Sequence, residues 1–254
     1  MPDFRRKLGE DAMTIDWAHH RKEVHNLGQV QDFLKQLVFG GNDGIVTTFA
    51  IVAGFAGAQA EGVTHVGAIA VLVFGLANLF ADAVSMGLGE FLSTRSKKDL
   101  YFKQRQFVFE EFVNHPRQEY AELIQMMTER GLPLSSARKI ADEVMKSPEL
   151  VADLMMSYEL EMHDMRQVSP ALDGLVTFLS FVSFGIIPLV PYLMLPPTEA
   201  TFLLSVLSTF LALVGLGLLR WWSTREKMSR CVGETLLVGG ACALVAFAVG
   251  AIVG

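Results

Sequence analysis

Cysteine is nearly absent from this chain: only Cys231 and Cys242 occur among 254 residues. On a helix their spacing corresponds to about 16 Å of rise, which is too far for a disulfide bond. The sequence also contains no Cys-x-x-Cys pair and no cysteine and histidine at zinc-site spacing. These absences exclude a disulfide-stapled domain and the common structural zinc sites.

Charged residues are scarce as well. They make up 19% of the chain, below the roughly 25% of an ordinary soluble domain. The formal net charge is −6, so there is no basic excess and we predict no nucleic-acid partner. The N-terminal region lacks an apolar core, and we expect no secretory signal there.

The chain contains several long apolar runs. Hydrophobic residues form 51% of the sequence and the mean hydropathy is +0.37, too apolar for an ordinary soluble domain. Five stretches reach the about 20 apolar residues that a helix needs to cross a bilayer. We therefore predict five transmembrane helices. Their expected ranges are 37–58, 66–92, 172–195, 201–219 and 232–253.

The distribution of basic residues predicts the orientation. Six of the 21 lysines and arginines lie in residues 1–36, eleven in 93–171 and four in 220–230. The connections 59–65 and 196–200 contain none. Because basic residues accumulate on the cytoplasmic side of membrane proteins, we expect the N-terminus in the cytoplasm and the C-terminus outside.

The connection between the second and third spans is long and polar, with 13 acidic and 11 basic residues. Proline and glycine divide it into helical segments, and no strand-like alternation competes. We therefore predict an all-α membrane protein whose five transmembrane helices carry a cytoplasmic helical insert between helices 2 and 3. The expected divisions are a cytoplasmic segment (1–36), transmembrane helices 1–2 (37–92), the insert (93–171) and transmembrane helices 3–5 (172–254).

Two aspartates lie inside predicted spans, where ionisable residues are costly and mark functional sites. Asp43 lies in the first span, and Asp82 lies in the second on a stripe with Asn78, Met86 and Glu90 at four-residue spacing. Carboxylate, amide and thioether ligands on one helix face suit a divalent first-row metal, because calcium and magnesium avoid sulfur. Simple packing of Met86 and helix–helix hydrogen bonding by Asn78 are the alternatives.

Acidic and methionine side chains also recur at helical spacing in the insert. Glu119 and Glu122 share a helix face, as do Met156 and Glu159. Folded together, these groups would bind metal; a solvated acidic face beside a methionine-rich core explains the spacing equally well. The candidate ligands in the insert are Glu110, Glu111, Glu119, Glu122, Met155, Met156 and Glu159.

From Leu37 onward the sequence resembles the vacuolar iron transporter family, in a bacterial-type version. The resemblance is carried by NDGIVTTFAIVAG and ADAVSMGLGEFLS in the first two spans, FEEFVNHPRQEYAEL and LMMSYELEM in the insert, and FGIIPLVPY and TLLVGG in later spans. It implies a homodimer whose pathway lies between the subunits and which moves Fe²⁺, and often Mn²⁺, out of the cytoplasm against protons. A bacterial-type member is expected in the inner (plasma) membrane, and Zn²⁺ and Co²⁺ are further candidate ions.

By position, the resemblance assigns Asp43 and Met86 to the transport pathway. The ligands that it assigns to a cytoplasmic metal-binding domain are Glu111, Glu119, Glu122, Met155 or Met156, and Glu159.

Two positions depart from the plant-type members of that family. Val108 occupies the position of a glutamate, for which Glu110 is a candidate substitute. Asn78 occupies the position of a second-span glutamate, and Asp82 follows one turn later. These departures leave the ion selectivity and the proton coupling open.

Two other classes of function are alternatives to a transporter. A membrane-bound metal sensor or scaffold would need the insert but not the intramembrane aspartates. A di-iron oxidase usually shows two Glu-x-x-His pairs, and the insert has none. We therefore predict a transporter that is not an enzyme and has no cofactor, with metal ions, protons, membrane lipid and a second copy of the chain as partners.

Overall fold

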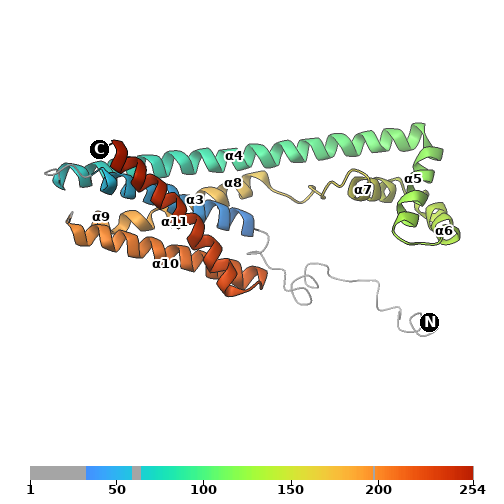
Figure 1. The fold of residues 1–254 in the computed structure, drawn as a ribbon. Coiled ribbons are helices and arrows are strands. Elements are labelled where there is room, and N and C mark those ends of the chain that lie inside the picture. Colours follow the sequence, from blue (N-terminus) through green and yellow to red (C-terminus); the bar gives the residue numbers. More distant parts are fainter. Residues whose placement is uncertain (1–32, 59–63, 197, 254) are drawn as a thin grey trace, which may run out of the picture. The chain divides into compact units, whose positions relative to one another are not determined.

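The computed structural model describes residues 33–58, 64–196 and 198–253, and every regular element in these ranges is a helix (Figure 1). The expectation of an all-α fold is confirmed. Most of the predicted segment 1–36 and most of the predicted loop 59–65 lie outside the described residues.

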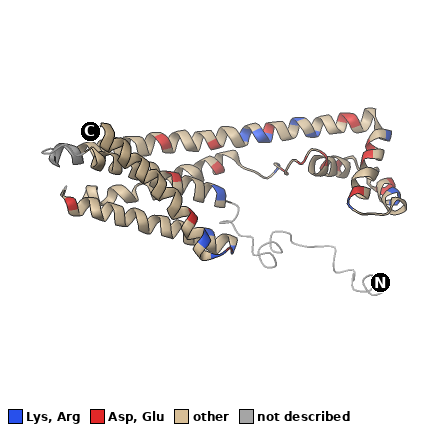
Figure 2. Ribbon diagram, in the orientation of Figure 1, with Lys and Arg blue, Asp and Glu red and all other residues tan. Residues whose placement is uncertain are grey.

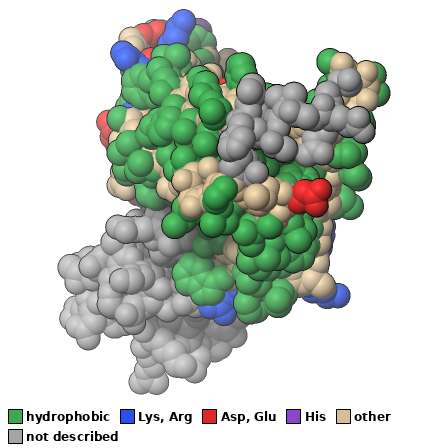
Figure 3. Space-filling view, turned by 90° about the vertical axis from the view of Figure 1, so that its left-hand side faces the viewer, with side chains coloured by type: hydrophobic (Ala, Val, Ile, Leu, Met, Phe, Trp, Pro, Cys, Tyr) green, Lys and Arg blue, Asp and Glu red, His purple; other side chains and the backbone are tan. Residues whose placement is uncertain are grey.

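Five helical segments are long and apolar enough to cross a membrane, which confirms the prediction of five spans. Hydrophobic side chains cover much of the face seen in Figure 3, and Leu203, Leu244 and Ile252 are among the large apolar side chains that are exposed. Such a surface suits the hydrocarbon core of a bilayer. The spans are α3 (Leu34–Gly57), α4 (Thr64–Asn114), α8 (Pro170–Gly185) continued by η2 (Ile187–Leu189) and α9 (Val190–Met194), α10 (Glu199–Thr224) and α11 (Met228–Val253).

Helix α4 is much longer than a membrane is thick. Its 51 residues correspond to about 77 Å at 1.5 Å per residue, against about 30 Å for the hydrocarbon core. The helix stops at Asn114 because Pro116 disfavours a helical conformation at His115, whose φ is −129° and ψ 50°. Pro116 then begins α5, which ends at Glu129. One continuous helix therefore carries both an apolar span and a charged extension.

The chain divides into two compact units, residues 1–88 with 173–254 and residues 89–172. We call them the membrane unit and the insert unit. In the membrane unit α3 packs against α10, α11 and η2. Gly44 of α3 lies directly against the backbone of Phe181 in α8, and Gly54 lies against Gly250 in α11. Small residues at these crossings allow helix backbones to approach closely.

The third expected span is a broken helix. After α8, Pro188 in η2 and Pro191 in the first turn of α9 have no N–H to continue the helical hydrogen bonding. Ser205 of α10 donates a hydrogen bond to the carbonyl of Pro188 at 2.6 Å, and Ser208 donates to the carbonyl of Ile187 at 3.4 Å. Hydroxyl groups of a neighbouring helix thus supply hydrogen bonds at the break, as lipid-buried backbone requires.

In the insert unit α5 (Pro116–Glu129), α6 (Leu134–Val144) and α7 (Pro148–Tyr158) accompany the second half of α4. The hydroxyl of Ser147 caps α7 by accepting a hydrogen bond from the N–H of Leu150 at 3.4 Å, and proline follows it in the favoured first position. The buried core of the unit consists of Tyr101, Val108, Leu123, Ala141, Val144, Val151, Ala152, Met155 and Met156.

Gly44 provides a test of the close helix packing. A Cβ atom at Gly44 would fall inside contact distance of the backbone oxygen of Phe181, whereas one at Gly215 of α10 would meet nothing within 4 Å. We expect Gly44→Ala to destabilise the membrane unit by about 1–3 kcal/mol and Gly215→Ala to cause no loss. Thermal unfolding in detergent, followed by size-exclusion chromatography, measures both. Equal midpoints for the two variants would contradict this packing.

Candidate functional site

The candidate residues of the membrane unit come from two helices. Asp43 of α3 and Asp82 of α4 lie close enough for their charges to repel each other. The amide of Asn78 donates a hydrogen bond to Oδ2 of Asp82 at 2.6 Å, and so orients that carboxylate. Among the described residues, neither aspartate forms an ion pair with a lysine or arginine. The fold thus brings two acidic groups together in an apolar bundle without a basic partner.

Met86 follows Asp82 by one turn of α4. It is half-buried and packs against Leu79, Ala83 and Phe181, so packing accounts for its conformation in this structure. Glu90 lies one turn further along the same helix, which places it about 12 Å from Asp82 along the axis. Within the predicted stripe, Asn78 and Asp82 interact directly.

Three uncharged polar residues of α3 were missed by the sequence analysis. Gln36, Asn42 and Thr48 each carry a buried side-chain oxygen that finds no hydrogen-bond partner within the described ranges. Buried polar groups are normally paired, so α3, the helix that carries Asp43, also offers buried oxygen atoms without a partner in the described ranges. Their signal in the sequence was the occurrence of amide and hydroxyl side chains within an apolar run.

The candidate residues of the insert unit centre on Glu119, near the start of α5. This side chain is only 5% exposed, and its Oε2 atom has no hydrogen-bond partner in the described part of the chain. Burial, and after it the neighbouring carboxylates of Glu122, Glu159 and Glu111 in that order, together raise the pKa of Glu119 from its usual value of 4.5 to about 7. Glu119 is therefore a carboxyl group poised to exchange a proton near neutral pH.

Glu159, at the end of α7, belongs to the same neighbourhood. Its pKa is raised by burial and by the charge of Glu122. Glu122 in turn accepts a hydrogen bond from Gln118 at 2.9 Å. The charges that act on Glu119 and Glu159 are thus all negative, which is the field that attracts a divalent cation.

Glu110 lies apart from this acidic group. It is exposed and accepts a hydrogen bond from Gln106, one turn earlier on α4, at 3.1 Å. Val108 is 5% exposed and packs in the core with Met155 and Met156. In this structure the position of the missing glutamate is thus filled by core packing, and Glu110 does not take its place beside Glu119.

Met155 and Met156 are each 1% exposed and belong to the core of the insert unit. Among the described residues, no three aspartate, glutamate, histidine or cysteine side chains come close enough together to hold a metal ion. The acidic side chains therefore share one neighbourhood without converging on a point. The buried Glu119 oxygen without a described partner, the carboxylates that repel it and the buried methionines of the same unit are donor types that suit a divalent first-row ion, which would draw the long glutamate side chains together.

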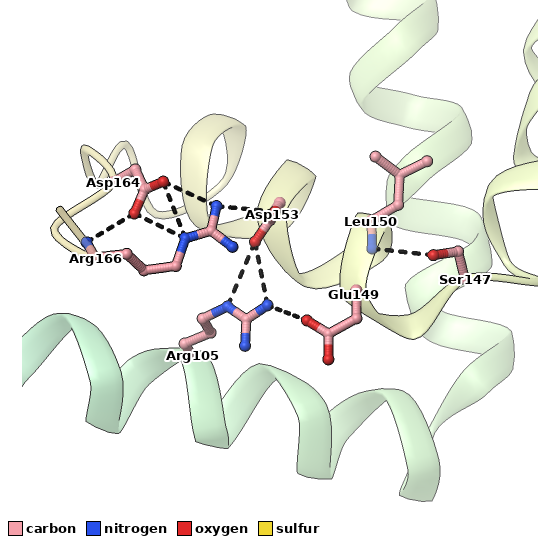
Figure 4. A network of polar contacts seen from close by, with 7 residues as sticks. All are labelled: Arg105, Ser147, Glu149, Leu150, Asp153, Asp164 and Arg166. Carbon is pink, nitrogen blue, oxygen red and sulfur yellow. Dashed lines mark hydrogen bonds and ion pairs between the residues drawn. The ribbon is translucent and has the colours of Figure 1, made fainter. Parts of the chain in front are cut away.

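A separate polar network ties α7 to its surroundings (Figure 4). Arg105 of α4 binds Glu149 and also Asp153, the latter at 3.3 Å. The second oxygen of Asp153 binds Arg166 at 3.1 Å, and Arg166 binds Asp164 at 2.8 Å. Asp153 and Asp164 flank the segment that contains Met155, Met156 and Glu159. The arginines therefore anchor both sides of the predicted ligand segment.

Comparison with known proteins decides the family. A model of the VIT family matches residues 34–251. The chain belongs to the VIT family. The vacuolar iron transporter of Toxoplasma gondii is 32% identical over 240 residues, which cover 91% of this chain and 77% of that protein. That of Plasmodium falciparum is 32% identical over 241 residues, covering 91% and 85%. Vacuolar iron transporter 1 of Arabidopsis thaliana is 28% identical over 235 residues, covering 92% and 90%.

Membership in the VIT family confirms the resemblance that the motifs indicated. The relatives are named as transporters, which agrees with the expectation that this VIT-family chain is not an enzyme. Together with the five apolar spans, the family assignment identifies it as an integral membrane protein.

The pKa of Glu119 can be tested directly in this VIT-family protein. We expect the carboxyl of metal-free Glu119 to titrate at about pH 7, and Glu122→Gln to lower that value because it removes a neighbouring negative charge. Infrared difference spectra of the protonated carboxyl band, assigned with Glu119→Gln, measure both. Glu129→Gln, an exposed change on the same helix, should have no effect. A titration near pH 4.5 would contradict the buried cluster.

Proposed function

We propose that this VIT-family protein exports divalent metal ions, Fe²⁺ first and Mn²⁺ second, from the cytoplasm in exchange for protons. The observation that carries the proposal is the pair Asp43 and Asp82, whose charges repel each other across two membrane-spanning helices without a basic partner in the described ranges. The names of the relatives, vacuolar iron transporters, supply the substrate.

The aspartate pair explains how metal and proton can alternate. Two negative charges that face each other in a low-dielectric region repel strongly. A divalent cation between Asp43 and Asp82 removes this repulsion, and so does a proton on either one. The two occupants therefore compete for one site, and interacting carboxyl groups of this kind titrate as a pair. Competition between cargo and proton is what an exchanger needs.

The insert supplies a collecting site for the same cargo. Glutamate oxygens suit Fe²⁺, Mn²⁺, Co²⁺ and Zn²⁺, and the thioether of Met155 or Met156 disfavours Ca²⁺ and Mg²⁺. Because Glu119 loses a proton near pH 7, metal binding at the insert should weaken as the pH falls below 7. The metal ion is the transported substrate here and not a resident cofactor.

Orientation and assembly complete the proposal. The clusters of basic residues favour a cytoplasmic N-terminus and insert and an outward C-terminus, in a bacterial inner membrane. A homodimer with its pathway between the subunits follows from the family resemblance. In that arrangement the insert takes metal from the cytoplasm and delivers it toward Asp43 and Asp82.

Asp43→Asn tests the pathway. The amide keeps the shape but carries no charge, so we expect it to abolish Fe²⁺ flux into vesicles with an acidic lumen, while metal binding by the insert is retained. Asp99→Asn, an exposed change on α4, is the control and should transport normally. Flux is measured with a fluorescent metal indicator.

Wild-type flux in Asp43→Asn would refute the assigned pathway. Metal binding by the wild-type protein without any flux would instead favour a membrane-bound sensor or scaffold.

The network around Arg105 generates a separate prediction. Arg105→Gln releases Glu149 and Asp153 and loosens α7, so we expect Co²⁺ binding at the insert to weaken about tenfold, the effect typical of losing an outer-shell support. A changed Co²⁺ absorption spectrum at saturation should accompany the loss, because the ligand geometry changes. Both are measured by optical titration of the full-length protein.

Arg95→Gln is the matched control on the same helix. Arg95 and Asp99 form a pair at 4.0 Å with side chains 64% and 74% exposed, and such surface pairs contribute little. We expect less than about a twofold change in affinity. If Arg105→Gln and Arg95→Gln gave the same affinity and spectrum, the arginine network would have no positioning role.

A further inference from the structure

Four basic residues lie within residues 220–230, around the turn between α10 and α11, where the ribbon of Figure 2 is coloured blue. Two of them share one acidic partner: Arg220 and Arg230 both bind Glu234, at 3.0 and 2.9 Å. Arg225 and Lys227 form no ion pair within the described ranges. Their cationic groups therefore remain available to a ligand.

A groove runs from this turn along the first part of α11. Its volume is about 670 Å³. One end is formed by Lys227, and the other end is apolar. The lining residues are Lys227, Met228, Ser229, Val232, Gly233 and Leu236. A groove that is cationic at one end and apolar at the other fits an amphiphile with a negative head.

The depth of the groove in the membrane agrees with this shape. Trp221 and Trp222, at the end of α10, are 42% and 59% exposed, and exposed tryptophans gather at the level of lipid headgroups. Leu236 lies about 13 Å along the helix from Lys227. Because the headgroup layer is only about 5–8 Å thick on each side, the apolar end reaches acyl-chain depth.

The charge of the turn selects among lipids. The four basic residues outnumber Glu226 and Glu234, so the turn carries a net positive charge. A zwitterionic lipid would bring its own cation next to Arg225 and Lys227, whereas an anionic lipid brings only its phosphate. A basic site at a membrane surface therefore favours anionic headgroups.

We propose that this groove is a binding site for one anionic phospholipid. Lys227, which lines the groove, holds its phosphate, and an acyl chain lies along Val232, Gly233 and Leu236. The site is separate from the residues assigned to metal and proton movement. It makes the lipid composition of the membrane a factor in how tightly the α10–α11 turn is held.

The glycines of α11 allow a matched test in the full-length protein. A Cβ atom at either Gly233 or Gly240 would meet nothing within 4 Å, so a larger side chain is compatible with the fold at both positions. Gly233 lines the groove, and Gly240, two turns further along α11, does not. Gly233→Leu should therefore fill the groove, while Gly240→Leu changes the same helix outside it.

The experiment is native mass spectrometry of detergent-solubilised protein titrated with phosphatidylglycerol or phosphatidylcholine. We expect the wild type to retain one phosphatidylglycerol in preference to phosphatidylcholine. Lys227→Gln should weaken that binding about fivefold, Gly233→Leu should abolish it, and Gly240→Leu should leave it unchanged.

Three results would overturn the proposal. The first is equal retention of the two lipids by the wild type. The second is undiminished phosphatidylglycerol binding in both Lys227→Gln and Gly233→Leu; the lysine variant leaves the groove open, so it remains informative if the leucine variant misfolds. The third is a changed ratio of monomer to dimer in Gly233→Leu with lipid binding intact, which would make the groove an interface between copies of the chain.

Discussion

Acidic side chains that have no basic partner in the described part of the chain are the constraint on which the account of this protein depends. The charge of Asp82 acts on Asp43 in the membrane unit, and Glu119 is buried near other carboxylates in the insert unit. Elsewhere in the insert unit the arginines neutralise Glu149, Asp153 and Asp164. Because unpaired negative charge in a low-dielectric region is costly, it is explained best by a mobile cation or proton that balances it.

The fold keeps these charges in place through unrelated contacts. Direct backbone packing at Gly44 fixes α3, which carries Asp43, against α8. Serine hydroxyl groups of α10 donate hydrogen bonds to the backbone carbonyls at the helix break that follows α8. In the insert unit, the buried methionines and the anchoring of Asp153 by Arg105 and Arg166 hold the end of α7. Helix packing and charge pairing thus carry the stability, and the unpaired carboxylates remain for the cargo.

Much of this architecture could be predicted from the sequence, because a span is specified by the length of an apolar run and a helix end by proline. Which side chains contact one another could not be predicted from the sequence. Spacing left Met155 and Met156 undecided between ligand and core, and only the packing shows that they are buried. Spacing also could not tell which of Glu110 and Glu111 belongs to the acidic group. Glu111 acts on Glu119 and Glu110 is exposed, and this difference depends on which face of α4 meets the core. The hydroxyls that satisfy the break after α8 come from a distant part of the chain.

The central claim is that metal and proton compete for the same carboxylates. Calorimetry of Fe²⁺ or Mn²⁺ binding to the full-length protein, in two buffers of different ionisation enthalpy, counts the protons that each metal ion displaces. The account predicts clear proton release at pH 6.5, where Glu119 is largely protonated, and less release at pH 8. Metal binding at pH 6.5 without proton release, or the same release at both pH values, would contradict it.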